Sequence, residues 1–174
     1  MKKVEEKLEF TAVVIVLSDK GSKGERKDLS GPKAKEILEQ NGYRVNKCIL
    51  LPDEPELLKS ELIRLTDEVK IDLIITSGGT GFSLRDNTPE ATLAVADRNA
   101  PGIAEAIRAE SLKITGHAML SRGVSVIRKQ TLIINLPGSH KAVKESLEYI
   151  LKYIDHGLKV LKGSAFDCAK EEKK

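Results

Sequence analysis

The stretch that most constrains the fold runs from Ile71 to Asp97 and reads IDLIITSGGTGFSLRDNTPEATLAVAD. It opens with an apolar, β-branched run, Ile71–Thr76, which has the length and composition of a buried strand. A glycine-rich segment follows at 78–81. Thr88-Pro89-Glu90 then has the pattern of a helix start, with Thr88 as the N-cap and Pro89 at the first helical position. The stretch predicts a strand, a glycine-rich loop, a charged turn and a helix.

The glycines can serve either the turn or a ligand. Without a Cβ the backbone bends sharply and a ligand can approach closely, and successive N–H groups can converge on an anion. A tight turn with no ligand explains an isolated Gly-Gly-x-Gly equally well. Arg85 and Asp86 follow the glycines directly and favour a phosphate or nucleotide site. Phe82-Ser83-Leu84 after Gly81 excludes both the Walker loop and the dinucleotide fingerprint.

Length and composition suit one domain with an aliphatic core. The chain has 174 residues, 3% aromatic residues and no tryptophan. We expect a single domain at 10–162, between a charged lead-in at 1–9 and a polar tail at 163–174. Acidic and basic residues alternate and the net charge is +3, which is typical of a solvated surface and not of a nucleic-acid interface. Two distant cysteines, Cys48 and Cys168, favour a reducing cytoplasm, and strand-sized apolar runs predict no membrane span.

Strand and helix patterns alternate along the chain. Strands are expected at 10–17, 43–50, 71–76, 125–128 and 131–136, the last two forming a hairpin. Helices are expected at 30–41, 56–69, from 88 onward, at 103–112 and at 139–153, with a break near Gly157 before a continuation to 161. This order predicts an α/β fold, a three-layer sandwich with a mostly parallel central sheet, helices on both faces and an antiparallel edge hairpin.

In such a sheet the ligand binds outside the carboxyl ends of the strands. The four loops expected at those ends, 18–29, 51–55, 77–87 and 137–140, carry acids and hydroxyl side chains. Asp53 and Asp86 come from two of these loops and can lie close together, as a seat for Mg²⁺. Each also has a structural explanation, because Asp53 can cap a helix and Asp86 can hold a turn, just as Ser139 can be only an N-cap. The three histidines show no ligand spacing, and no nucleophilic triad is evident.

Several segments together resemble the molybdopterin-binding proteins of molybdenum cofactor biosynthesis. The main one is Thr76–Gly81 followed by Arg85-Asp86-x-Thr88-Pro89-Glu90-Ala91. Matching segments are Ser18-Asp19, the run 28–32, the turn 51–53 and Asn135–Ser139. The similarity covers about residues 10–162, and Ser77 stands where threonine is usual. Within the family, the stretch 117–138 is more similar to the MogA-type adenylyltransferases than to the shorter MoaB branch.

The resemblance implies an activity. AMP is transferred from Mg-ATP to the terminal phosphate of molybdopterin, and the product passes to the protein that inserts molybdate. It also implies a homotrimer. It places the two functional acids, which would also hold Mg²⁺, on Asp53 and Asp86. It places the binding segments on Ser18, Asp19, Ser77, Gly78, Gly79, Thr80, Gly81, Arg85, Pro137, Gly138 and Ser139.

A second function remains open at the level of sequence. The same fold could serve a non-catalytic molybdopterin carrier, in which the glycine loop supplies affinity alone. The pair of acids favours the enzyme, because two carboxylates repel a pterin phosphate unless a cation lies between them.

Overall fold

The computed structural model describes residues 9–163, which share one six-stranded sheet with the strand order β2-β1-β3-β6-β5-β4. The strands are β1 (Thr11–Leu17), β2 (Arg44–Leu51), β3 (Leu73–Ser77), β4 (Arg98–Asn99), β5 (Ser125–Arg128) and β6 (Thr131–Leu136). β2, β1, β3 and β6 run parallel, whereas β5 and β4 pair antiparallel at one edge. The predicted mixed sheet and its edge hairpin are confirmed.

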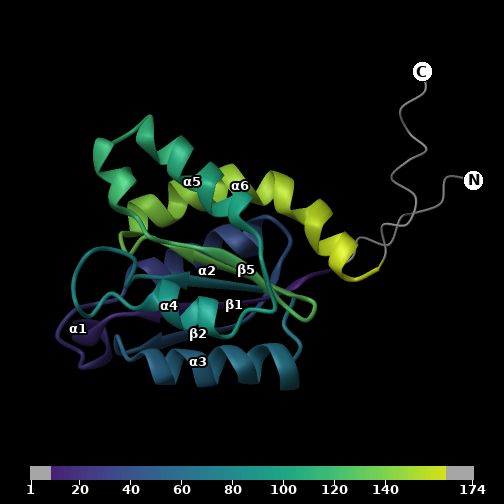
Figure 1. Ribbon diagram of the computed structural model, residues 1–174, viewed down its shortest axis with the longest axis horizontal. Helices are drawn as coiled ribbons and strands as arrows, with labels where there is room; N and C mark the ends of the chain where they lie inside the picture. The colour runs from purple at the N-terminus through teal and green to yellow at the C-terminus, as the bar shows by residue number, and fades with distance from the viewer. Residues whose placement is uncertain (1–8, 164–174) are drawn as a thin grey trace, which may run out of the picture.

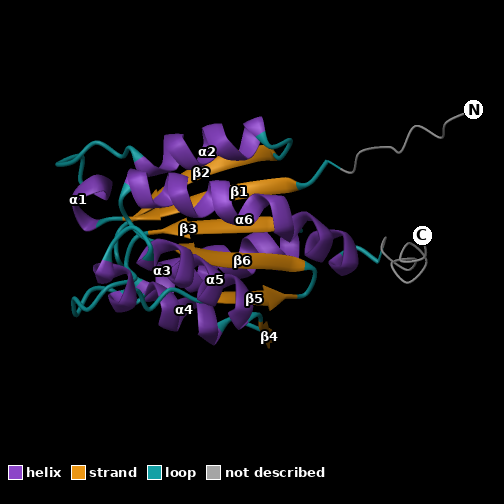
Figure 2. Cartoon of the chain, turned by 90° about the horizontal axis from the view of Figure 1, so that it is seen from above, coloured by secondary structure: helices purple, strands orange, loops and turns teal. Residues whose placement is uncertain are grey.

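Helices cover both faces of the sheet (Figures 1 and 2). The α-helices are α1 (Asp19–Ser22), α2 (Ser30–Gln40), α3 (Pro55–Ile63), α4 (Thr88–Ala94), α5 (Pro101–Leu112) and α6 (His140–Leu161). A π-helical segment, η1, spans Arg64–Glu68, and a 3-10 segment, η2, spans Gly116–Leu120. α2, α5 and α6 pack on one face and α3 and α4 on the other, so the three-layer prediction is confirmed.

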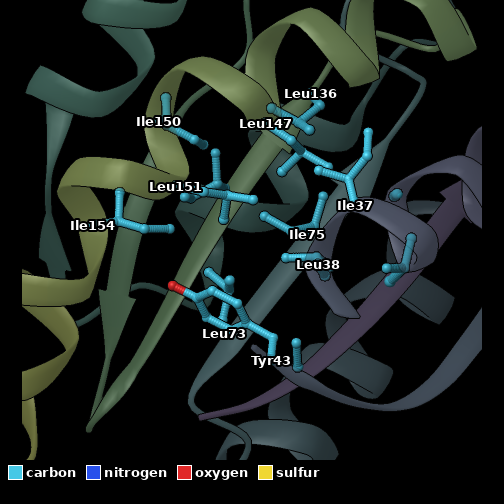
Figure 3. Packing of buried hydrophobic residues seen from close by; sticks show 14 of the residues in the cluster. Ile37, Leu38, Tyr43, Leu73, Ile75, Leu136, Leu147, Ile150, Leu151 and Ile154 are labelled. Atoms are coloured by element: carbon cyan, nitrogen blue, oxygen red, sulfur yellow. The ribbon is translucent and has the colours of Figure 1, made fainter. Parts of the chain in front are cut away.

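Each face of the sheet has its own aliphatic core, because successive side chains of a strand point to opposite faces. Val14, Leu73 and Ile75 meet α2 and α6 on one face, where Leu147 and Leu151 are almost fully buried (Figure 3). On the other face, alternate residues of the same strands pack against α3, η1 and α4. The central strands are therefore apolar at nearly every position, which is the reason for the continuous β-branched runs in the sequence.

The C-terminal helix corrects one prediction. The expected break near Gly157 is wrong, because α6 continues without interruption from His140 to Leu161. Ile154 and Leu158 lie on either side of the glycine and are buried at 6% and 1% exposure. A glycine inside a helix costs about 1 kcal/mol relative to alanine, and burying two such side chains outweighs this cost.

Smaller differences concern element ends. The helix expected at 56–69 ends as an α-helix at Ile63 and continues as the π-helical turn η1. Thr88 is the first helical residue of α4 and not its N-cap, which is Asn87. β4 was not expected, since two exposed polar residues give no periodic signal.

The described residues extend over almost all of the predicted domain. The expected lead-in at 1–9 and tail at 163–174 lie outside the described residues, apart from residues 9 and 163. The division into 1–9, 10–162 and 163–174 stays a prediction. Within residues 9–163, none of the helices is both long and apolar enough to cross a membrane.

Candidate active site

The carboxyl ends of the four parallel strands meet at one edge of the sheet, and their loops enclose a cavity of about 510 Å³. Seven residues predicted for the site line this cavity: Ser18, Asp53, Gly78, Gly79, Asp86, Gly138 and Ser139. Six others do not line it and lie in the adjoining loops and strand end: Asp19, Ser77, Thr80, Gly81, Arg85 and Pro137. The structure thus brings Asp53 and Asp86 to one cavity, as expected of loops that share one edge of the sheet.

Hydrogen bonds between loops hold the walls of the cavity in place. The Ser77 hydroxyl donates to the Pro137 carbonyl at 3.0 Å, which ties the end of β3 to the end of β6. The Ser30 hydroxyl donates to the Gly138 carbonyl at 2.7 Å, which ties the start of α2 to the same turn. Ser77 and Pro137 therefore hold the walls in place and do not face the cavity themselves.

The glycine loop is required first by the protein's own packing. Gly78 has φ +102°, and a Cβ there would lie 2.4 Å from the Leu17 carbonyl oxygen. Gly79 has φ +64°, and a Cβ there would lie 2.3 Å from Thr88 Oγ1 and 3.3 Å from Asp53 Oδ1. The loop passes so close to β1 and α4 that only glycine fits at both positions.

The same loop carries backbone donors, and one of them belongs to Gly79, which lines the cavity. Within the part of the chain that the structure describes, no acceptor takes the N–H groups of Gly79, Thr80 or Gly81. The 22-residue helix α6 also begins here, with Ser139 and His140 on the cavity wall and the Ser139 hydroxyl accepting from the Ala142 N–H at 3.2 Å. Free N–H groups and the N-terminus of a long helix both favour a bound anion.

Asp53 is held by a reciprocal pair of hydrogen bonds. Its Oδ2 accepts from the Asp19 N–H at 2.9 Å, and its own N–H donates to Asp19 Oδ1 at 3.0 Å. Arg85 grips Asp19 through Nε and Nη2 at 2.9 and 2.8 Å and donates to Glu54 at 2.8 Å. Arg85 therefore binds two carboxylates, those of Asp19 and Glu54. It makes no direct hydrogen bond to Asp53 and acts on it through Asp19.

The charges around Asp53 oppose its ionisation. Burial raises the pKa of the Asp53 carboxyl, the hydrogen bond from the Asp19 N–H lowers it, and the nearby charges of Asp19 and Asp86 raise it again. The Arg85 hydrogen bonds hold the pKa of Asp19 below its usual range. Asp19 thus stays a carboxylate, and Asp53 is the acid with the most to gain from a cation in the cavity.

Asp86 is oriented by its own turn. Its Oδ2 accepts from the Ser83 N–H at 2.9 Å, and its N–H donates to the Ser83 carbonyl at 2.9 Å. This is the turn-holding role that the sequence left open for Asp86. Asp86 lines the cavity in this conformation.

Comparison with known proteins identifies the family. Residues 13–156 match the model of the probable molybdopterin-binding domain. The chain belongs to this family. It is 41% identical to the molybdopterin adenylyltransferase of Helicobacter pylori strain J99, over 87% of each chain. It is 44% identical to the molybdopterin adenylyltransferase of Escherichia coli K12, over 78% of this chain and 70% of that one.

Solved structures of the family have the same fold. The molybdopterin biosynthesis enzyme MoaB of Thermus thermophilus superposes with a TM-score of 0.84 at 44% identity, over 88% of this chain and 97% of that one. A structure of MogA superposes with a TM-score of 0.83 at 38% identity, over 87% and 99%. The predicted resemblance is confirmed, and the chain is a member of the MogA/MoaB family of molybdopterin adenylyltransferases.

Sequence analysis included Asp28 in the run 28–32 but missed two basic residues of the cavity. Arg26 and Lys27 line it from the loop between α1 and α2, together with Asp28. Asp28 Oδ1 accepts from the N–H groups of Ser30 at 2.9 Å and Gly31 at 3.1 Å, so it caps α2. The sequence feature that could have indicated Arg26 and Lys27 is the excess of basic residues in the loop 18–29, which directly follows a strand end.

The donor set fits a magnesium ion shared with a phosphate. No cluster of three or more histidine, cysteine or acidic side chains that could hold a metal occurs among residues 9–163. Two carboxylates from different strand ends do line the same cavity. Mg²⁺ is commonly held by one or two carboxylates together with substrate phosphates and water, and Asp53 and Asp86 supply that number.

Proposed function

We propose that this chain transfers AMP from Mg-ATP to the terminal phosphate of molybdopterin, giving adenylylated molybdopterin and pyrophosphate. The observation that carries the proposal is that Asp53 and Asp86, from different strand ends, line one cavity together with anion-binding groups. The identity of 41–45% with molybdopterin adenylyltransferases of several bacteria supports it.

The reaction asks for positioning and charge neutralisation more than for covalent help. An oxygen of the molybdopterin phosphate bonds to the α-phosphorus of ATP, and the bond from that phosphorus to the bridging oxygen of pyrophosphate breaks. The N–H group of Gly79 and the first turn of α6 would hold phosphate oxygens. Arg26 and Lys27 would offset the charge that develops on the leaving pyrophosphate.

Asp53 and Asp86 would hold the magnesium ion that accompanies ATP. When bound, the ion supplies positive charge to the phosphates without any proton transfer. The chain's own task is to present both carboxylates in ionised form. For Asp53, the hydrogen bond from the Asp19 N–H to Oδ2 and the nearby Arg85 charge lower the pKa, against burial and the two neighbouring acids.

A non-catalytic molybdopterin carrier is the alternative. A carrier needs the glycine loop and the basic residues, but two carboxylates beside them would weaken its hold on an anionic pterin. The distinguishing experiment mixes the purified protein with molybdopterin and ATP labelled at the α-phosphate, with and without Mg²⁺. We expect labelled molybdopterin and pyrophosphate in equal amounts, only with Mg²⁺. Calorimetric binding of molybdopterin without any labelled product would establish the carrier instead.

The remaining expectations follow from the family and stay predictions. We infer a homotrimer that works in the cytoplasm and passes its product to the protein that inserts molybdate. No role for nucleic acid or membrane is expected. The aliphatic composition and interspersed charges are in line with this placement.

A further inference from the structure

Arg122 binds both ends of the loop that carries Asp86. It lies between η2 and β5, and its N–H donates to the Thr80 carbonyl at 2.9 Å. Its Nε donates to the Gly81 carbonyl at 2.8 Å, and its Nη2 donates to the Asp86 carbonyl. One residue thus holds three carbonyl oxygens, two before and one after the tip of the loop.

Apolar packing does little to hold that tip in place. Phe82 and Leu84 are the large apolar residues of the segment, and they are 70% and 97% exposed. Burial therefore contributes almost nothing to the loop's conformation, which must depend on hydrogen bonds. Those within the tip join Ser83 to Asp86 and Arg85. Two arginines then link the tip to the body of the protein: the Arg85 side chain through Asp19 and Glu54, and Arg122 through the loop's backbone carbonyls.

The charge of Arg122 is balanced away from the cavity. Nη1 and Nη2 also contact the Glu90 carboxylate in the first turn of α4, and the hydrogen bond from Arg122 lowers the pKa of Glu90. Arg122 reaches the carbonyl of Asp86 and not its carboxylate, and it does not line the cavity. Arg122 therefore fixes the backbone of Asp86 and makes no bond to its carboxylate.

We propose that Arg122 is the positioning residue for Asp86 in AMP transfer. It closes the loop 80–86 through the carbonyls of Gly81 and Asp86 and thereby sets the direction of the carboxyl group. This role rests on the proposed function, because it assumes that Asp86 takes part in AMP transfer. It requires a guanidinium, whose planar fork presents several donors at once, and a lysine ammonium cannot span the same acceptors.

The first test compares Arg122→Lys with Arg128→Lys. Arg128 is a matched control, since it also binds a carbonyl, that of Val95, and a carboxylate, that of Asp67, but at the other end of β5. We expect Arg122→Lys to lower kcat for AMP transfer at least about tenfold with KM for molybdopterin changed less than about twofold. Arg128→Lys should lower Tm and leave kcat unchanged. A wild-type kcat in folded Arg122→Lys would overturn the proposal.

The second test uses the Asp86→Asn background. If Arg122 acts through Asp86, adding Arg122→Lys to Asp86→Asn should lower the residual rate by less than about twofold. The same loss as in the wild-type background would show that Arg122 acts independently of Asp86 and would overturn the proposal.

The third test needs no activity and separates this proposal from the proposed function. Hydrogen exchange of the Ser83 and Asp86 amides, which are bonded within the loop, should speed up at least about tenfold in Arg122→Lys and remain unchanged in Arg128→Lys. If the wild-type protein fails to transfer AMP, the proposed function fails while this measurement still decides whether Arg122 holds the loop. Unchanged exchange in Arg122→Lys would reject the positioning role.

Discussion

At the scale of single residues, Asp53 occupies a place that disfavours its own charge. It is partly buried, it faces Asp19 and Asp86, and its pKa is raised. Acids with a raised pKa are frequent at positions where the residue serves ligand binding or catalysis and not the stability of the fold. The bound cation that the reaction needs would relieve the repulsion among these acids.

Asp53→Asn should therefore stabilise the metal-free protein at neutral pH. Asp53 has an ordinary pKa of 3.8 when the chain is unfolded and a higher value when it is folded, so the folded state binds more protons between the two. The free energy of unfolding therefore decreases as the pH rises from the unfolded-state pKa to the folded-state pKa of Asp53. Above the folded-state pKa the full destabilisation by the ionised carboxylate is present. We expect the variant's Tm in EDTA to exceed that of the wild type at pH 7.5, with a smaller difference near pH 4.

Asp67→Asn is the control of opposite sign. Its hydrogen bonds with Arg128 hold the pKa of Asp67 well below the ordinary value, so its contribution is present at neutral pH and is lost as the pH falls. Asp67→Asn should lower Tm at pH 7.5, and its effect should fade in acid. A decrease in Tm for Asp53→Asn at pH 7.5 would contradict the explanation given for Asp53.

At the scale of elements, the glycine loop joins β3 to α4 under tight steric limits. The Gly79 carbonyl accepts from the Thr88 N–H at 3.1 Å, and the Thr88 hydroxyl lies against the Gly79 Cα. The first residue of α4 is thus packed on the loop. The glycine pattern reflects this packing in addition to any phosphate that the loop binds.

Gly79→Ala should destabilise the protein by at least about 1 kcal/mol, because alanine is strained at φ +64° and its Cβ would meet Thr88. Gly157→Ala is the matched control, since nothing lies within 4 Å of a Cβ there and the residue is inside α6. That change should stabilise by about 0.5–1 kcal/mol. Urea unfolding measures both, and equal effects of the two substitutions would show that Gly79 is not under steric constraint.

Elements with a strong local pattern could be predicted from the sequence. The β-branched run gave β3 to within about two residues, and Ser139 gave the start of α6, where its hydroxyl caps the helix. The π-helical turn η1 and the two-residue β4 have no periodic signal of their own. They follow from packing between distant segments.

The site was predictable where chemistry lies next to a strand end. The placement of Asp53 and Asp86 at one cavity was predicted in this way, since parallel strands bring their carboxyl ends to one edge. Arg122 was not found, because 36 residues separate it from the Asp86 carbonyl it binds, and no spacing rule joins them. Arg85 was expected at the ligand, but its partners Asp19 and Glu54 come from two other loops and became visible only in the fold.

At the scale of the whole molecule, the family resemblance predicts a homotrimer. Several large apolar side chains near the end of α5 and in η2 are 42–68% exposed: Leu112, Ile114, Met119 and Leu120. An oligomer interface that covers apolar helix surface would account for such exposure. Light scattering at micromolar concentration should give three times the chain mass of 19.1 kDa. A monomer mass across that range would contradict the trimer.

The central claim, that Asp53 and Asp86 serve AMP transfer and not molybdopterin affinity, is tested most directly by one paired measurement. Molybdopterin binding by calorimetry and AMP transfer with Mg²⁺ are compared in the wild type, Asp53→Asn and Asp86→Asn. We predict that both variants fold and bind molybdopterin within about threefold of the wild type, while transfer falls by at least about a hundredfold. Transfer at the wild-type rate in both folded variants would contradict the claim.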